Sequence, residues 1–338
     1  MTRSPASIMA KSAIAWPTVA SAGTDDTLSD RPPGMTAVTA AAILATLTCV
    51  GVLVQIMTLT GARGLLAVTS PACPGGPGPT RRPLMDILAV DIGGTKLLCR
   101  AVSASGDVHS ELRVDTGADC GPAHLDAVID EFVGSVPDVR TVGIACPGLL
   151  SPDGARVVVA DVLPQLRGWR PRALDGPRPG CLVNDVRAAL LAATVAHPQD
   201  DELAVVVVGT GIAAGFTSRG HVHHGADGWA GELGSIPVRV TGATTTTLDA
   251  AASGAAVLRL LALPPAEVAA RAADGQVDVV RIIEAAGHAL GEGLATFVNL
   301  VNPRRVVLAG GTLAYPGYLE AALTSARRYT LTQHWAAC

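Results

Sequence analysis

A basic cluster is what this 338-residue sequence lacks most clearly, because its formal net charge is −4 and its lysine and arginine residues are dispersed. Nonspecific binding to nucleic acid depends on concentrated positive charge, so we expect no nucleic-acid partner. The seven cysteines are scattered and form no Cys-x-x-Cys pair. This scatter supports neither a zinc site nor a disulfide framework, and it favours a reducing compartment, the cytoplasm.

The length and composition suit a protein with two packed lobes. The chain is 49% hydrophobic and 16% charged, which is enough apolar material for two cores. From Met85 onward, short apolar runs alternate with helical patterns, as is typical of an α/β protein. We therefore expect an N-terminal lobe at 85–195 and a C-terminal lobe at 196–338.

Residues 1–84 differ in character from the rest of the chain. The uncharged apolar stretch 37–59 is long enough to span a bilayer, and 70–83 is a Pro/Gly linker. The stretch could be a membrane anchor, or the whole segment could be an extension that results from an upstream start. We favour the extension, because Met85 stands directly before the first strand pattern and Gln55 interrupts the apolar stretch.

The apolar runs predict the order of the secondary structure elements. In the first lobe we expect strands at 86–92, 97–102, 107–114, 140–146 and 181–185, with helices at 122–133 and 186–195. In the second lobe we expect strands at 203–208, 212–217 and 306–308, with a helix at 277–301. Each lobe opens on a strand, a glycine turn and a second strand, which suggests a duplicated lobe facing a common cleft.

Three glycine turns follow predicted strands, and glycine alone lets a backbone turn tightly enough to bring its N–H groups against a phosphate. Any one of them could be an ordinary hairpin, so their joint order carries the argument. Asp91, at the end of the first strand, could orient Mg²⁺. The residues we expect to bind the nucleotide are Asp91, Gly93, Gly94, Thr95, Lys96, Gly209, Thr210, Gly211, Gly310 and Gly311.

Phosphoryl transfer to a hydroxyl needs a carboxylate that accepts the hydroxyl proton. Asp185 is our candidate for this base, because it ends an apolar strand just before a helix and would therefore face the cleft. The alternative is that Asp185 simply caps that helix, since Asn and Asp are preferred caps.

The three turns together resemble the phosphate and adenosine motifs of the sugar kinase/actin/heat-shock ATPase superfamily, and DIGGTK resembles the ROK family within it. The resemblance covers roughly residues 86–312. It implies a two-lobed actin-like ATPase (ribonuclease H-like) fold with the active site in the interlobe cleft. It further implies use of ATP and Mg²⁺, a homodimer, Asp185 as catalytic base, and sugar binding by Asn184 and by Glu232 of an AGExG-like segment.

Three substrate-side positions depart from the family pattern. Ser235 replaces a histidine that usually touches zinc and sugar, and the cysteine-rich zinc loop is missing, so we expect no zinc. Asp249 stands where the family has Glu, and Asp161 stands where sugar kinases usually carry Asn. The pattern resembles the zinc-less branch that includes C7-cyclitol kinases of aminocyclitol (antibiotic) biosynthesis, which phosphorylate a primary hydroxyl of valiolone-like rings.

We therefore expect a kinase that acts on a polyhydroxylated small molecule, with a C7-cyclitol as the favoured acceptor. A glucokinase-like hexose kinase is the alternative within the same class. A sugar-responsive transcriptional repressor of the ROK family is the alternative of another class. Residues 1–84 lack the basic amphipathic helix pair that a repressor's DNA-binding module would need. The last dozen residues also look unlike the family's ending, and we expect apolar surface of the second lobe to be left open to water there.

Overall fold

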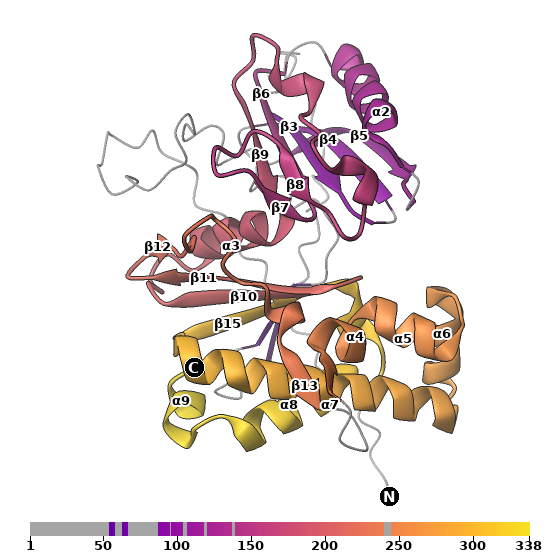
Figure 1. Cartoon of the computed structure of the whole chain (residues 1–338), viewed down its shortest axis with the longest axis vertical. Coiled ribbons are helices and arrows are strands. Elements are labelled where there is room, and N and C mark those ends of the chain that lie inside the picture. Colours follow the sequence, from indigo (N-terminus) through magenta and orange to yellow (C-terminus); the bar gives the residue numbers. More distant parts are fainter. Residues whose placement is uncertain are drawn as a thin grey trace, which may run out of the picture.

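Two lobes lie one above the other along the long axis of the molecule, with helix α3 (Asp185–Ala196) between them (Figure 1). The structure is a computed structural model. It describes residues 54–57, 63–66, 87–94, 96–103, 107–117, 120–136, 139–239 and 245–338.

The first lobe is built on a five-stranded sheet in the order β5-β4-β3-β6-β9. The first three strands form an antiparallel meander, and β6 and β9 continue the sheet in parallel. Every residue of β6 is buried, as its continuous apolar run predicts. Helix α2 packs its Leu125, Ile129 and Phe132 into the core of this lobe. The bounds are β3 Ile87–Ile92, β4 Lys96–Val102, β5 Val108–Asp115, α2 Pro122–Ser135, β6 Thr141–Cys146 and β9 Gly180–Asn184.

The second lobe repeats this plan. Strand β10 pairs antiparallel with β11 and parallel with β15, just as β3 pairs with β4 and β6. The predicted duplication of the lobe is therefore confirmed. Its sheet has the order β12-β11-β10-β15-β1-β2. The bounds are β10 Leu203–Val208, β11 Ile212–Ser218, β12 His221–Val222, β15 Arg305–Ala309, β1 Val54–Met57 and β2 Arg63–Leu66.

Strand β1 lies inside the apolar stretch 37–59 and pairs antiparallel with β15. The remainder of that stretch and the 70–83 linker lie outside the described residues. Within the part of the chain that the structure describes, no helix is long and apolar enough to cross a membrane.

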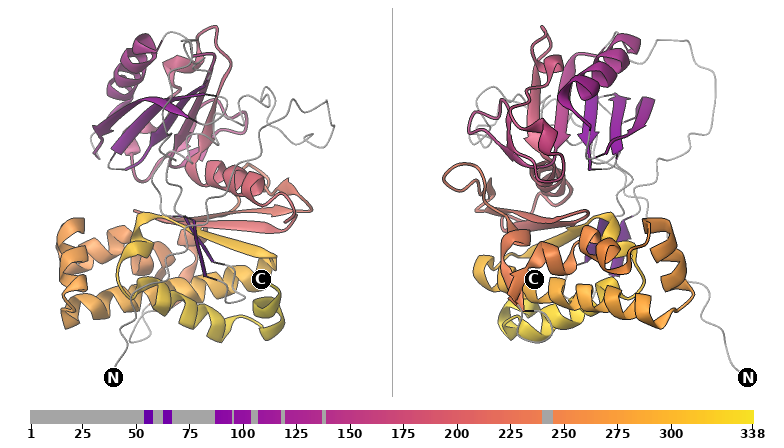
Figure 2. Two further views of the ribbon diagram at one scale, coloured as in Figure 1. Left: turned by 180° about the vertical axis from the view of Figure 1, so that it is seen from behind. Right: turned by 45° about the vertical axis from the view of Figure 1, so that its right-hand side comes forward.

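Helices cover one side of the second sheet (Figures 1 and 2). The predicted long helix is α7, and it packs Ile283, Leu290 and Leu294 into the core. Helix α8 approaches it closely, because a Cβ atom added at Gly287 would lie 2.3 Å from the carbonyl oxygen of Tyr318. The elements here are β13 Pro237–Arg239, β14 Thr245–Thr247, α4 Leu248–Ala252, α5 Gly254–Leu261, α6 Pro265–Ala273, α7 Val277–Val301, α8 Tyr318–Tyr329 and α9 Thr332–Ala337.

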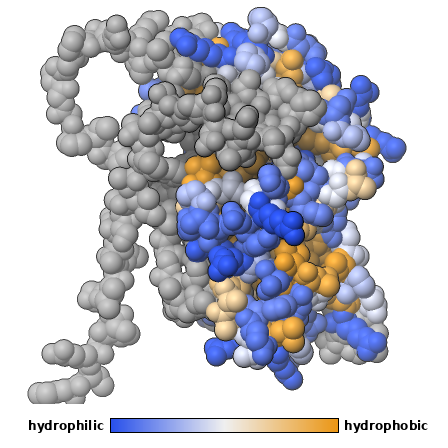
Figure 3. Space-filling model, turned by 90° about the vertical axis from the view of Figure 1, so that its left-hand side faces the viewer, coloured by the Kyte–Doolittle hydropathy of each residue, from blue (hydrophilic) through white to orange (hydrophobic). Residues whose placement is uncertain are grey.

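The end of the chain differs from the expectation of an open apolar surface. Helix α9 lays Trp335 against the core of the second lobe, and Cys338 is buried there. Large apolar side chains are still exposed nearby, at Leu300, Tyr329 and Leu331. On the face shown in Figure 3, hydrophilic side chains predominate and hydrophobic ones form separate patches.

Helix α3 contacts both sheets. Its Leu190 and Ala193 pack with Leu203, Val205 and Val307 of the second lobe. Its Ala188 packs with Ala145 and Val183 of the first lobe. The helix therefore packs against both lobes, and the residues at its N-terminus lie where the sheets face each other.

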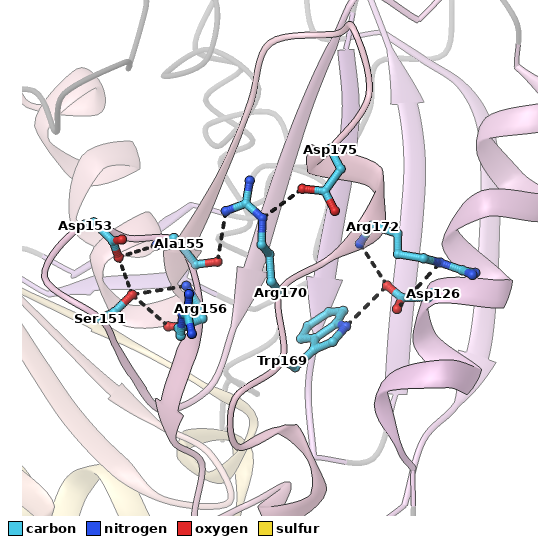
Figure 4. Close-up of polar contacts among 9 residues, drawn as sticks. All are labelled: Asp126, Ser151, Asp153, Ala155, Arg156, Trp169, Arg170, Arg172 and Asp175. Carbon is cyan, nitrogen blue, oxygen red and sulfur yellow. Dashed lines mark hydrogen bonds and ion pairs between the residues drawn. The ribbon is translucent and has the colours of Figure 1, made fainter.

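A polar network attaches the segment between β8 (Val157–Val159) and β9 to helix α2 (Figure 4). Asp126 is buried on α2, and its Oδ1 accepts hydrogen bonds from Nε1 of Trp169 at 3.2 Å and from the backbone N–H of Arg172 at 3.1 Å. This segment also carries Asp161, so the network positions one of the predicted substrate residues.

Replacement of Asp126 by Ala should destabilise the protein by about 1–3 kcal/mol, because it would leave the Trp169 and Arg172 donors without this acceptor. Asp130→Ala is the matched control, since Asp130 lies on the same helix as Asp126 and forms an exposed ion pair with Arg172. We expect about 1 kcal/mol or less from the control. Urea unfolding of both variants measures the difference, and equal midpoints would contradict this role for Asp126.

Candidate active site

The first glycine turn lies at the boundary between the lobes. Gly93 donates its N–H to the carbonyl oxygen of Lys96 at 2.8 Å, which closes the hairpin between β3 and β4. A Cβ atom added at Gly94 would lie 2.3 Å from Cγ1 of Val162 and 3.7 Å from Oγ1 of Thr210. The first turn therefore meets both the Asp161 segment and the second glycine turn. Lys96 is exposed, and Thr95 lies outside the described residues.

The second and third turns also meet. Oγ1 of Thr312 donates to the carbonyl oxygen of Gly209 at 3.1 Å, and the N–H of Gly254 donates to the same oxygen at 2.8 Å. Gly310 has a φ of +117°, and a Cβ atom there would lie 2.2 Å from the carbonyl oxygen of Val208. Turns 93–94, 209–211 and 310–312 thus converge, although more than 200 residues separate the first from the last.

Asp185 is the first residue of α3, at the carboxyl end of β9. Its Oδ1 accepts the backbone N–H of Val186 at 2.8 Å. Burial, followed by the negative charge of Asp91, raises the pKa of Asp185 from 3.8 to about 7, and Glu232 adds a smaller contribution. Burial also raises the pKa of Asp91 to about 6. The structure therefore brings these predicted residues into one electrostatic unit.

Asn184 is the N-cap of α3, which was the role we considered for Asp185. Its side-chain oxygen accepts the N–H of Arg187 at 3.1 Å, and its Nδ2 donates to the carbonyl oxygen of Gly148 at 2.9 Å. The amide therefore ties the Pro147-Gly148 turn to the helix that begins with Asp185.

The remaining predicted substrate residues come from separate segments. Oδ1 of Asp249 accepts the N–H of Ile212 at 2.6 Å, and its carboxyl group lies against Gly211 and Gly234. Partial removal from water raises the pKa of Asp249 and of Glu232, and the charge of Asp161 contributes to both shifts. Asp161 and Ser235 are exposed.

The family model described as the ROK family matches residues 87–338 of this chain. The chain belongs to the ROK family. A glucokinase of Halalkalibacterium halodurans is 23% identical to it over 266 residues, which cover 66% of this chain and 79% of that protein. An N-acetylmannosamine kinase of Shigella boydii is 27% identical over 267 residues, which cover 71% and 88% of the two chains.

Solved ROK-family structures share the architecture. The crystal structure of the ROK hexokinase from Thermus thermophilus superimposes with a TM-score of 0.59 at 27% sequence identity and covers 74% of this chain and 90% of that chain. The expected two-lobed actin-like ATPase fold is therefore confirmed.

The residues of this ROK-family site suit a nucleotide and Mg²⁺. A Cβ atom added at Gly209 or Gly311 would meet no protein atom within 4 Å, so open space adjoins both glycines. Asp91 offers hard oxygen ligands, and it forms no ion pair with Lys or Arg in the described ranges. Mg²⁺ usually binds through one or two carboxylates plus substrate phosphates. Among residues 87–338, the described ones include no group of three or more His, Cys, Asp and Glu side chains that could hold a metal ion.

Sequence reasoning missed three side chains of the site. Arg187, His223 and Trp229 line a pocket together with Asn184 and Glu232. Trp229 comes directly before the AGExG-like segment, and that position was the only sequence signal for it. Arg187 and His223 carried no signal, because only the fold brings α3 next to the loop that follows β12.

Proposed function

We propose that this ROK-family protein is an ATP-dependent kinase that phosphorylates a hydroxyl group of a sugar-like small molecule. One observation carries the proposal: glycine turns from both lobes converge beside Asp91, and Asp91 lies close enough to Asp185 to raise its pKa. The names of similar proteins, glucokinase and N-acetylmannosamine kinase, support the same reaction class.

In this proposal each group of residues has a separate task. Asp185 accepts the proton of the attacking hydroxyl, and its raised pKa of about 7 makes it a stronger base than an ordinary carboxylate. Bound Mg-ATP supplies the phosphoryl group. The backbone N–H groups of the glycine turns would orient its phosphates, and Asp91 would hold the Mg²⁺, which neutralises charge on the phosphates. Glu232 and Asp249 accept hydrogen bonds from acceptor hydroxyls, whereas Asn184 holds the Gly148 turn in place.

The acceptor we favour is a C7-cyclitol such as a valiolone derivative, phosphorylated on its primary hydroxyl, without zinc. Ser235, Asp249 and Asp161 support this choice, because each alters hydrogen bonding to the acceptor. A carboxylate at 161 can only accept hydrogen bonds, whereas an amide there would donate as well. A glucokinase-like hexose kinase is the second candidate, and the names of the relatives favour it.

We further propose that the kinase works in the cytoplasm, where its substrates ATP and Mg²⁺ are available. The cysteines agree with this location, because free thiols are typical of a reducing compartment. Among the described residues the free cysteines are Cys99, Cys120, Cys146, Cys181 and Cys338. A homodimer is implied by the family resemblance and stays a prediction.

ATP turnover by the full-length chain should depend on the acceptor. We expect a valiolone-type cyclitol to exceed glucose and N-acetylmannosamine in kcat/KM by about tenfold or more, the scale of one well-placed polar contact. An enzyme-coupled ADP assay measures this preference. Asp161→Asn should move the preference toward glucose. Highest activity on glucose would favour the hexose kinase, and no acceptor-dependent turnover would contradict a kinase.

A further inference from the structure

The loop between β12 and Glu232 is fixed firmly at its ends. At its start, His223 donates its N–H to the carbonyl oxygen of Phe216 at 2.9 Å. At its end, Gly231 accepts the N–H of Ala214 at 2.7 Å. Gly231 has a φ of +109°, and a Cβ atom there would lie 1.8 Å from the carbonyl oxygen of Ala214, so only glycine fits. Both ends are therefore anchored on β11 of the second lobe.

The middle of the same loop is held from outside the second sheet. Nη2 of Arg187 on α3 donates to the carbonyl oxygen of Gly228 at 2.9 Å. Nε1 of Trp229 donates to the carbonyl oxygen of Leu150 at 2.9 Å, a bond that spans 79 residues of sequence. Leu150 belongs to β7 (Leu149–Leu150), which pairs with β8 in the first lobe. The indole hydrogen bond therefore joins the two lobes.

Arg187 and Leu150, which hold the middle of the loop, lie close in sequence to residues of the predicted site. Leu150 follows Gly148, which the side chain of Asn184 holds, and Arg187 follows Asp185. Trp229 comes three residues before Glu232. The side chains of Trp229, Arg187 and Glu232 line the same pocket. The position of Glu232 relative to Asn184 and Arg187, which line the same pocket, thus depends on the contacts at 228 and 229.

We propose that Trp229 is a positioning residue, whose hydrogen bond to Leu150 holds the two lobes closed over the acceptor and fixes Glu232 opposite Asp185. The inference rests on the proposed kinase function. Trp229 itself is 38% exposed and contributes little to either core. Its hydrogen bond therefore fixes the position of one lobe relative to the other and adds little to the stability of either lobe. Closure of a cleft around substrate by such contacts is a common way to assemble a catalytic site.

Trp229→Phe tests this, because it keeps an aromatic ring and removes only the Nε1 donor. We expect KM for the best acceptor to rise about three- to tenfold, the effect of one lost hydrogen bond, with KM for ATP unchanged. Without ligands, small-angle scattering should give a larger radius of gyration for the variant. Arg187→Met removes the second contact on this loop and should change the acceptor KM in the same direction.

Trp335→Phe is the matched control, since it also exchanges an indole for a phenyl ring, but on α9, where the side chain packs against the core of the second lobe and does not line the pocket. It should lower the unfolding temperature and leave the acceptor KM and the radius of gyration unchanged. A Trp229→Phe protein that matches the wild type in both quantities would overturn the proposal. If the wild type phosphorylates no acceptor, the kinase function fails, and the comparison of radii alone decides whether Trp229 holds the lobes together.

Discussion

Replacement of Asp185 by Asn should lower kcat by about 10²- to 10⁴-fold, the usual contribution of a general base. The amide cannot accept the hydroxyl proton, whereas it retains nearly the same shape. AMPPNP should still bind with near-wild-type affinity, because the glycine turns are untouched. Asp175→Asn is the matched control, an exposed carboxylate paired with Arg170. Turnover by the Asp185→Asn enzyme within tenfold of wild type would remove this residue from the mechanism.

The same variant should reveal the cost of keeping Asp185 ionised. Its pKa is raised from 3.8 to about 7, so the folded protein binds this proton more tightly than the unfolded chain does. Stability is therefore lost as the pH rises from 3.8 to about 7, and the whole cost is present above pH 7. We expect Asp185→Asn to raise the unfolding temperature at pH 8 and to change it little at pH 4. The wild-type kcat/KM should correspondingly fall below pH 7, where the base becomes protonated.

Gly310→Ala should destabilise the second lobe by about 3–5 kcal/mol and weaken nucleotide binding strongly. The backbone at Gly310, with φ of +117° and ψ of 153°, occupies a region reserved almost entirely for glycine. The added Cβ atom would also lie 2.2 Å from the carbonyl oxygen of Val208, and a backbone atom cannot easily move aside. Such a combination of strain and overlap belongs to the severe class of substitutions.

Gly311→Ala provides the comparison for stability, because a Cβ atom at that glycine would meet nothing within 4 Å. We expect its free energy of unfolding to stay within about 0.5 kcal/mol of wild type. Guanidinium unfolding of both variants and calorimetric titration with AMPPNP measure the two effects. Equal stability of the two variants would show that the third turn can relax and that its conformation is not required.

Much of the fold could be predicted from patterns that are local in sequence. The runs that became β6 and β10 are continuous and apolar, as strands buried on both faces must be, and α7 shows helical spacing over its full length. Less could be predicted where local patterns are weak. Helix α9 is short and amphipathic only through Trp335, and the two-residue strand β7 leaves no recognisable pattern.

The residues of the candidate site also divide into those that local sequence patterns could predict and those that they could not. Asp91, Asp185 and the glycine turns could be found because each stands next to a strand end, a relation visible in sequence. The N-cap role, which was the alternative considered for Asp185, belongs to Asn184, since both residues are good caps and only the backbone decides between them. Arg187 and Trp229 could not be found, because their partners are carbonyl oxygens on distant segments, and every residue type has one.

The sequence by itself determined the strands and helices with strong patterns, the three glycine turns and the candidate base, because backbone geometry and burial impose those residue types locally. Only the tertiary structure decided that the turns converge, that Asp91 and Asp185 share one electrostatic environment, and that Trp229 bridges the lobes. These features depend on distances between segments far apart in the chain. Such distances follow from the packing of both sheets against α3, which no single segment encodes.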